Sequence, residues 1–152
     1  MTARGVHVLD SMLHIAGPIE SVFAFSEKLQ HEIDVDDTTA ATMRFSGGAT
    51  GLLATLHAAS AFYRIHVFGS TGALEMRGET ELLVSDLDGN SERFTYPAID
   101  KEGAELEDFA DAIGAGLKFV IAPEEVVNGV AAMEAVAESA RTRQPVKIAP
   151  FG

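Results

Sequence analysis

The stretch Asp37-Thr-Thr-Ala-Ala-Thr-Met-Arg-Phe45 decides the fold, because its side chains alternate between two sets. The first set is Thr39, Ala41, Met43 and Phe45, and the second is Thr38, Ala40, Thr42 and Arg44. A period of two is typical of a strand with one buried face. Gly47 and Gly48 follow, and glycine accepts the positive φ of a tight hairpin. The sequence therefore predicts a hairpin in which 49–58 returns beside 37–45.

Further segments extend this hairpin into a larger sheet. Short turns separate several of them, including Gly69-Ser-Thr-Gly72 and Asp88-Gly89-Asn90. Strands joined by such turns run antiparallel, since parallel strands need long crossover connections. The predicted additional strands are 19–28, 62–68, 73–77, 80–86 and 91–96.

Three segments outside the run of strands have apolar residues at helical spacing, namely 2–14, 100–117 and 123–143. Pro123 with two glutamates after it suits a first turn, and a short extended tail, 144–148, closes the chain. The order of helix, strands and two helices predicts one α+β domain over 1–152. We expect an open, mostly antiparallel sheet with helices packed on one face.

Composition excludes several classes of function. The chain has 23 Asp and Glu against 11 Lys and Arg, a formal net charge of −12, so phosphate backbones and anionic lipid surfaces repel it. We expect no nucleic-acid or membrane partner. No segment is typical of a signal peptide or membrane span, which predicts a cytoplasmic protein. Without cysteine, any chemistry must come from His, carboxylate, Lys or hydroxyl groups.

His7, Asp10 and His14 follow the spacing i, i+3, i+7 and share one face of the first predicted helix. Imidazole and carboxylate groups both bind metals. His7 and His14 are, however, separated by roughly 10 Å along the helix axis, so one ion does not easily take both. The alternative is a polar surface face, and we expect no metal.

Three other features have competing interpretations. His57 shares a strand side with Leu53 and Thr55, so it is either a cleft residue or a partly buried histidine satisfied by the backbone. The acidic run 32–37 lacks the glycine and closing glutamate of a calcium loop, which favours a solvated loop. Gly114-Ala-Gly116 imitates a dinucleotide fingerprint, but it follows a helix and lacks the third glycine. We therefore expect no cofactor site in this chain.

Taken together and in order, four stretches resemble the C-terminal domain of the Gfo/Idh/MocA oxidoreductases, the family of glucose-fructose oxidoreductase and inositol dehydrogenases. They are Gly5-Val-His7-Val-Leu-Asp10, Asp36-Asp37-Thr38 through Phe45-Ser-Gly-Gly48, Val67-Phe-Gly-Ser-Thr-Gly72, and Glu138-Ser139-Ala140 through Pro145-Val146. The resemblance implies a dihydrodipicolinate reductase-like fold. It also implies that a Rossmann domain precedes residue 1 and binds NAD or NADP. The chain would then be the substrate-side and oligomerisation domain, inactive alone, of an enzyme acting on a sugar, polyol or related hydroxy compound.

The resemblance carries over only His7 as a catalytic group. It would accept a proton during oxidation of a carbinol and donate one during reduction, which suits an imidazole. Many family members carry Asp four residues before this histidine, whereas this chain has Ala3. That departure leaves open a catalytically altered protein that serves mainly as an assembly module. Arg4 and His57 are the weaker candidates for contact with substrate.

One face of the predicted hairpin is small and uncharged. It carries Thr38, Ala40, Thr42, Thr50, Leu52, Ala54 and Leu56. If the helices cover the other face, this one is left as an apolar patch, and such patches usually mark interfaces. The family resemblance points to the same face. We therefore expect a homodimer or larger even oligomer formed through the sheet.

Overall fold

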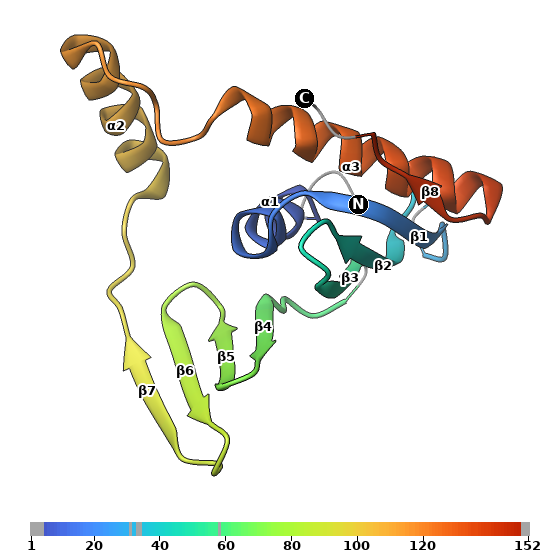
Figure 1. Ribbon diagram of the computed structural model, residues 1–152, viewed down its shortest axis with the longest axis horizontal. Helices are drawn as coiled ribbons and strands as arrows, with labels where there is room; N and C mark the ends of the chain where they lie inside the picture. Colours follow the sequence, from blue (N-terminus) through green and yellow to red (C-terminus); the bar gives the residue numbers. More distant parts are fainter. Residues whose placement is uncertain (1–4, 31, 33–34, 58, 150–152) are drawn as a thin grey trace. The chain divides into compact units, whose positions relative to one another are not determined.

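The computed structural model describes residues 5–30, 32, 35–57 and 59–149 (Figure 1). They form two compact units, residues 1–58 with 120–152 and residues 59–119. Each predicted helix and strand is present. The elements are α1 (Gly5–Ala16), β1 (Ile19–Glu27), β2 (Thr38–Phe45), β3 (Thr50–Leu56), β4 (Arg64–Gly69), β5 (Gly72–Arg77), β6 (Glu81–Asp86), β7 (Ser91–Thr95), α2 (Lys101–Ala115), α3 (Pro123–Thr142) and β8 (Val146–Lys147).

The first unit contains an antiparallel sheet with strand order β3-β2-β1-β8. The predicted hairpin joins β2 to β3. Its turn holds Gly48 at φ 91°, and the Gly48 N–H donates to the Phe45 carbonyl oxygen at 2.9 Å. The alternation predicted for β2 is confirmed, because the side chains of the first set are all less than 5% exposed: Thr39, Ala41, Met43 and Phe45.

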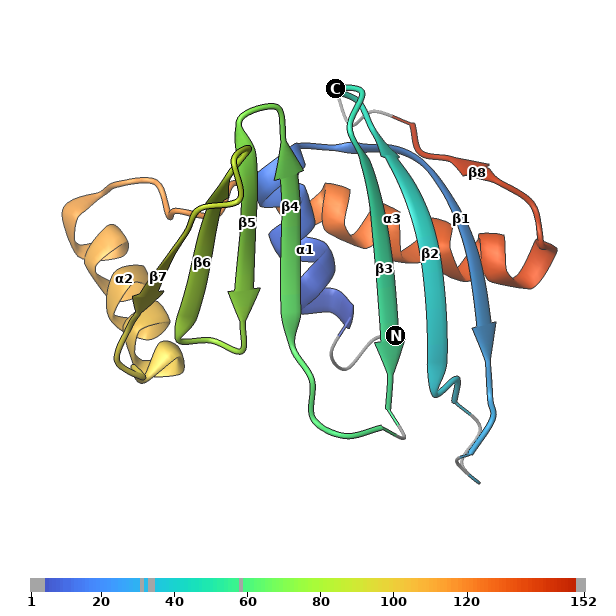
Figure 2. The same ribbon diagram turned by 90° about the horizontal axis from the view of Figure 1, so that it is seen from below.

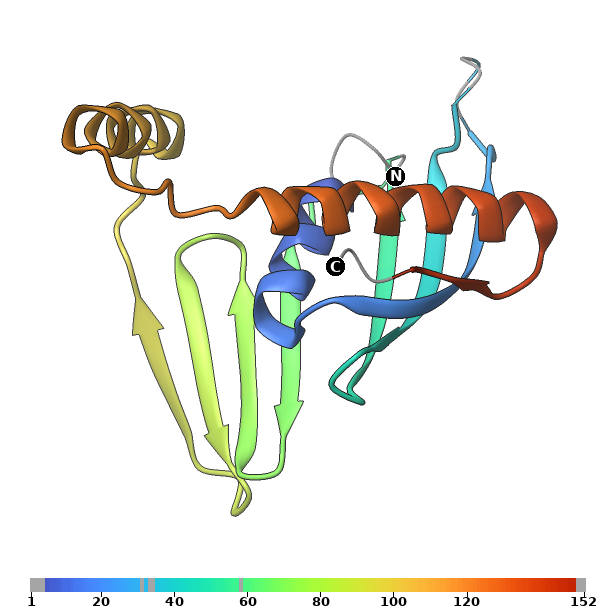
Figure 3. The same cartoon turned by 45° about the horizontal axis from the view of Figure 1, so that its top comes forward.

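Two helices cover the buried face of this sheet. α3 packs on β1, and α1 packs on β3 and α3. Figures 2 and 3 show both helices on the same side of the strands, with α3 running across them. Leu9 of α1 and Val136 of α3 are 1% and 2% exposed within this core. The predicted arrangement of helices on one face is therefore confirmed for α1 and α3.

A buried serine completes the edge of β1. β8 pairs with β1 only at Ser21 and Val22. Farther along, the Ser139 hydroxyl accepts the N–H of Ala24 at 2.9 Å and donates to the carbonyl oxygen of Gln144 at 2.7 Å. One side chain of α3 thus takes the place of a strand partner.

The second unit contains the sheet β4-β5-β6-β7, so the strands divide between two sheets where one was expected. A hairpin would need a turn between β3 and β4, but the link 57–63 contains no glycine. The α+β class with antiparallel strands is confirmed.

α2 departs from the expected packing on a sheet. It buries no residue, and Figure 1 shows it standing clear of β4–β7. Its apolar residues Leu106, Phe109 and Ile113 stay 69%, 50% and 67% exposed, although the Phe109 ring meets the Phe119 ring edge to face with centroids 5.4 Å apart. None of the helices described here is both long enough and apolar enough to cross a bilayer.

Candidate functional site

α1 presents the predicted catalytic histidine from a helix that the core holds in place. Leu9 is buried, and Met12 and Leu13 pack against the same core. The helix ends where the Gly17 N–H donates to the Leu13 carbonyl oxygen at 2.8 Å, with Gly17 at φ 80° before a proline. At 100° per residue, His7 lies opposite Leu9. Because the core holds the Leu9 side of α1 in place, the direction of the His7 side is fixed as well.

His7, Asp10 and His14 are all exposed on that outer face. His7 and Asp10, three residues apart, are neighbours on the helix surface. The Ser11 hydroxyl donates to the His7 carbonyl oxygen at 2.8 Å, so the Ser11 side chain is hydrogen-bonded to the backbone of its own helix. Among the described residues, no three His, Asp or Glu side chains group so as to hold a metal ion. The face therefore offers an imidazole beside a carboxylate.

The other candidate residues from the sequence are Arg4 and His57. Arg4 and Ala3 fall outside the described residues. His57 follows β3 directly and is exposed, so the alternative of a partly buried histidine is wrong at this position. Its backbone N–H donates to the Asp37 carbonyl oxygen at 2.8 Å. The role of each residue toward substrate stays a prediction.

Asp37 is a buried structural residue that the sequence interpretation missed. It is 3% exposed, although it ends the acidic run predicted to be a solvated loop. Its carboxylate accepts the backbone N–H groups of Leu29 and Gln30 at 3.0 Å and 2.6 Å. It also accepts the Thr38 hydroxyl at 3.1 Å. The carboxylate thus closes the β1–β2 connection, and the preceding acids gave no signal that this one turns inward.

A pocket of about 520 Å³ lies between α3 and the ends of β1 and β2. Met133, Val136, Ala137 and Ala140 supply apolar walls, and the polar lining residues are Ser26, Lys28, Asp36, Thr39 and Arg141. The Ser26 and Thr39 hydroxyls are 2.7 Å apart, so they satisfy each other. Arg141 pairs with Glu138 at 2.7 Å. Neither His7 nor His57 lines this pocket, so it is separate from the predicted site.

One side of the sheet of the first unit is left uncovered by the helices described in that unit, and it is here called the open face: Phe23, Phe25, Ala40, Thr42, Leu52, Ala54 and Leu56. The strand register places these side chains in two central rows, Phe23-Thr42-Leu52 and Phe25-Ala40-Ala54. Leu52 is 80% exposed and Phe25 is 48% exposed. The Phe23 and Phe25 rings meet edge to face with centroids 5.0 Å apart. The two rows contain no charged residue, as the sequence predicted for β2 and β3.

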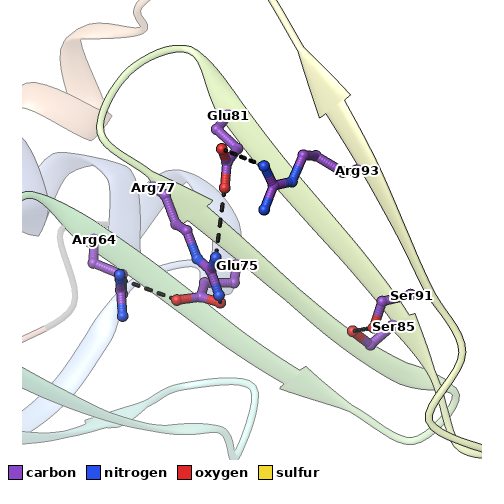
Figure 4. A network of polar contacts seen from close by, with 7 residues as sticks. All are labelled: Arg64, Glu75, Arg77, Glu81, Ser85, Ser91 and Arg93. Carbon is purple, nitrogen blue, oxygen red and sulfur yellow. Dashed lines mark hydrogen bonds and ion pairs between the residues drawn. The ribbon is translucent and has the colours of Figure 1, made fainter.

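The sheet of the second unit carries a charged network across all four strands (Figure 4). The Glu75 carboxylate contacts Arg64 at 3.0 Å and Arg77 at 2.8 Å. Glu81 contacts Arg77 at 3.6 Å and Arg93 at 3.5 Å. The hydrogen bond from Arg77, with the charge of Arg64, holds the pKa of Glu75 below its usual value, and the same contact raises the pKa of Arg77. These pairs favour one register, since opposite charges meet only in this alignment.

The sequence interpretation also missed this network. The signal was present as Glu75-Met-Arg77 and Glu81 on alternate positions of neighbouring strands. Without the strand register, charged residues two positions apart indicate only that one side of a sheet faces solvent.

Comparison with known proteins agrees with this architecture. The family model described as GFO/IDH/MocA C-terminal domain matches residues 1–75. None of the curated proteins compared with the chain matches it.

Solved structures share the fold over almost the whole chain. A candidate NADPH-dependent oxidoreductase from Desulfitobacterium hafniense is 22% identical, with a TM-score of 0.87, over 96% of this chain and 47% of its own. An Agrobacterium radiobacter oxidoreductase, solved with NAD+, L-tartaric acid and magnesium, is 19% identical, with a TM-score of 0.82, over 95% and 47%. The WlbA dehydrogenase of Bordetella pertussis, solved with NADH and UDP-GlcNAcA, is 18% identical, with a TM-score of 0.77, over 96% and 44%.

The chain spans a little under half the length of each of these solved proteins. At such identities the likeness shows the fold, whereas the matched residues 1–75 carry the sequence evidence. The match over residues 1–75 and the shared fold therefore confirm the resemblance to the C-terminal domain of the GFO/IDH/MocA oxidoreductases.

Proposed function

We propose that this chain is the substrate-side and assembly domain of an NAD(P)-dependent oxidoreductase that acts on a sugar, polyol or related hydroxy compound. The observation that carries the proposal is His7, exposed beside Asp10 on a helix whose opposite face is anchored in the core. The residues matched by the family model include both. The dinucleotides and the sugar nucleotide in the solved relatives support the choice of reaction and substrate class.

The proposed chemistry of this chain is a proton transfer. In the oxidation direction, the His7 imidazole takes the proton of a substrate hydroxyl, and in reduction it returns that proton to the carbonyl oxygen. An imidazole suits both directions because its usual pKa lies near neutral pH.

The run Gly114-Ala-Gly116 does not fit a dinucleotide. Gly116, the second glycine of the run that imitates a fingerprint, caps the C-terminal end of α2 at φ 65°. A pyrophosphate binds at a helix N-terminus, where backbone N–H groups point outward, whereas a C-terminus presents carbonyl oxygens. We therefore place the cofactor in a separate nucleotide-binding half. The isolated chain should bind NAD(H) no better than about millimolar, and micromolar binding by calorimetry would contradict this assignment.

Replacing His7 with alanine in the protein that contains both halves tests the proton-transfer role. We expect turnover to fall by about 10²- to 10⁴-fold, the usual contribution of a positioned acid or base, with an unchanged melting temperature. His14→Ala is the matched control, because it removes an exposed imidazole from the same helix face. Equal turnover in the two variants would show that His7 is a surface residue without a catalytic role. Arg4→Ala and His57→Ala should instead raise KM if these residues contact substrate.

Ala3 favours a second candidate function, that of an assembly module in a protein with altered catalysis. The family resemblance places an aspartate at that position, and its loss weakens support for the imidazole. The two functions separate on the His7 variant, because an assembly module keeps its oligomeric state and has no turnover to lose.

We also propose that two copies of this chain associate through the open face. The chain carries a net charge of −12, so copies repel each other over most surfaces, but the central rows of the open face are uncharged. Small side chains such as Ala40 and Ala54 allow two sheets to approach to about 10 Å. Exposed Leu52 and Phe25 supply the apolar area that association would bury.

Sedimentation of variants tests this interface. Ala40→Glu or Ala54→Glu places a carboxylate in a central row and should convert a dimer to a monomer at tens of micromolar. Ala104→Glu, which adds the same charge at an exposed position on α2, should leave the dimer intact. A wild-type monomer at that concentration, or a dimer that survives both open-face substitutions, would rule out this surface.

A further inference from the structure

Gly51 lies inside β3, where a glycine needs a reason because it gives the strand no side chain to pack. Two usual reasons do not apply to it. Gly51 is not one of the residues with positive φ, and it pairs with Met43 in a register that continues without a shift along β2 and β3. The remaining reason is that another segment approaches the backbone closely at this point.

α1 makes this close approach through Met12. A Cβ at Gly51 would stand 2.6 Å from Cε of Met12 and 3.0 Å from Cε2 of Phe45. Phe45 is 2% exposed, so its ring has little room to move, and Met12 packs against the same core. The Met12 methyl group therefore occupies the place that a side chain at position 51 would fill. With a larger residue there, Met12 would have to give up this contact or α1 would have to move.

A second glycine beside α1 shows the difference between contact and collision. Gly129 of α3 also borders α1, but a Cβ there would lie 3.9 Å from Cδ1 of Leu13, which is an ordinary van der Waals distance. α3 can therefore accept an alanine at position 129, whereas β3 cannot accept one at position 51 without a shift. The distance between α1 and β3 thus depends on Gly51.

We propose that Gly51 is a positioning residue that sets the place of His7 relative to the sheet of the first unit. This inference rests on the proposed function, in which His7 moves the proton. Met12 and His7 belong to the same helix, α1, and are separated by about 7.5 Å along its axis. A shift of the helix at Met12 therefore reaches His7, and a misplacement of about 1 Å can cost about 10²-fold in rate. Gly51 itself touches no substrate in this role, because it acts through α1.

Kinetics of variants test this role in the protein that contains both halves, with the hydroxy compound on which the His7 variants are assayed. We expect Gly51→Ala to lower kcat at least about tenfold while KM changes less than about twofold, because a displaced base slows the chemistry without removing a contact to substrate. Adding Met12→Ala to this variant removes the colliding methyl group and should raise kcat several-fold. Gly129→Ala, the matched control beside the same helix, should keep the wild-type kcat. In the 152-residue chain, the amide NMR shifts of residues 5–9 should change in Gly51→Ala and stay in place in Gly129→Ala.

The positioning role and the proposed function fail on different results. A Gly51→Ala protein with a lower Tm but the wild-type kcat, or with unchanged amide shifts at residues 5–9, would overturn the positioning role alone. A double variant no faster than Gly51→Ala would do the same, because the collision would then not involve α1. If Gly51→Ala does not fold, Met12→Phe enlarges the same contact from the helix side and carries the same expectation. Wild-type turnover in His7→Ala, assayed in parallel, would remove the proposed function and with it the catalytic purpose of Gly51.

Discussion

Replacing Ser139 with alanine removes the hydroxyl that joins α3 to the edge of β1. In the native chain this hydroxyl accepts the Ala24 N–H and donates to the Gln144 carbonyl oxygen. Ser139 and Ala24 are both 0% exposed. Water therefore cannot replace the lost acceptor without opening the packing of α3 on β1.

The expected loss of stability depends on which hydrogen-bond partner of Ser139 stays buried. A buried N–H without an acceptor costs about 1 to 3 kcal/mol. Gln144 is exposed, so its carbonyl oxygen regains a water and adds little. We expect Ser139→Ala to lower the free energy of unfolding by about 2 kcal/mol. For a chain of this size that corresponds to a fall in Tm of about 4 to 8 °C.

Thermal and urea unfolding measure this loss, and amide exchange at Ala24 localises it. Thr142→Ala is the matched control, because the Thr142 hydroxyl donates to a carbonyl oxygen of its own helix at an exposed site. The control should change stability by less than about 0.5 kcal/mol. A Tm of Ser139→Ala equal to wild type, with the Ala24 amide still protected, would refute the bridging role.

Two further predictions concern the sheet of the second unit. Gly72→Ala should weaken the β5–β6 pairing by about 2 kcal/mol or more, because Gly72 has φ 156° and an added Cβ would collide with the Ser85 carbonyl oxygen. Gly78→Ala, which also has positive φ but open space around it, should cost less, and equal losses measured by urea unfolding would contradict the collision. Glu75 has a folded-state pKa below its usual value of 4.5, so it stabilises the folded chain above that pH and the contribution disappears as pH falls through the lower value. Glu75→Gln should therefore flatten the dependence of unfolding free energy on pH between about 5 and 3, and an unchanged slope would show that Arg77 does not stabilise the carboxylate.

Sequence patterns were sufficient to predict an element wherever the residues of that element alone determine its structure. Alternation in 37–45 identified both the strand and its buried set, and the same alternation identified the side that remains open. Gly47-Gly48 located the hairpin, and the caps Asp100 and Gly116 bound α2 close to its expected ends. The candidate site was accessible to the same reasoning only in part. Helical spacing put His7, Asp10 and His14 on one exposed face, while the role of His7 came from a family resemblance.

The tertiary structure alone decided how these elements meet. Ser139 lies 115 positions from Ala24, so no local pattern could show that one hydroxyl would complete the edge of β1. The inward turn of Asp37 and the Glu75 network depend on register and loop closure, which fix contacts between different segments. The division into two sheets and the exposure of the apolar residues of α2 also depend on how the segments pack. Periodicity determines which side of an element is apolar, because it follows from backbone geometry. Which surface then covers that side depends on the packing of the whole chain and its partners.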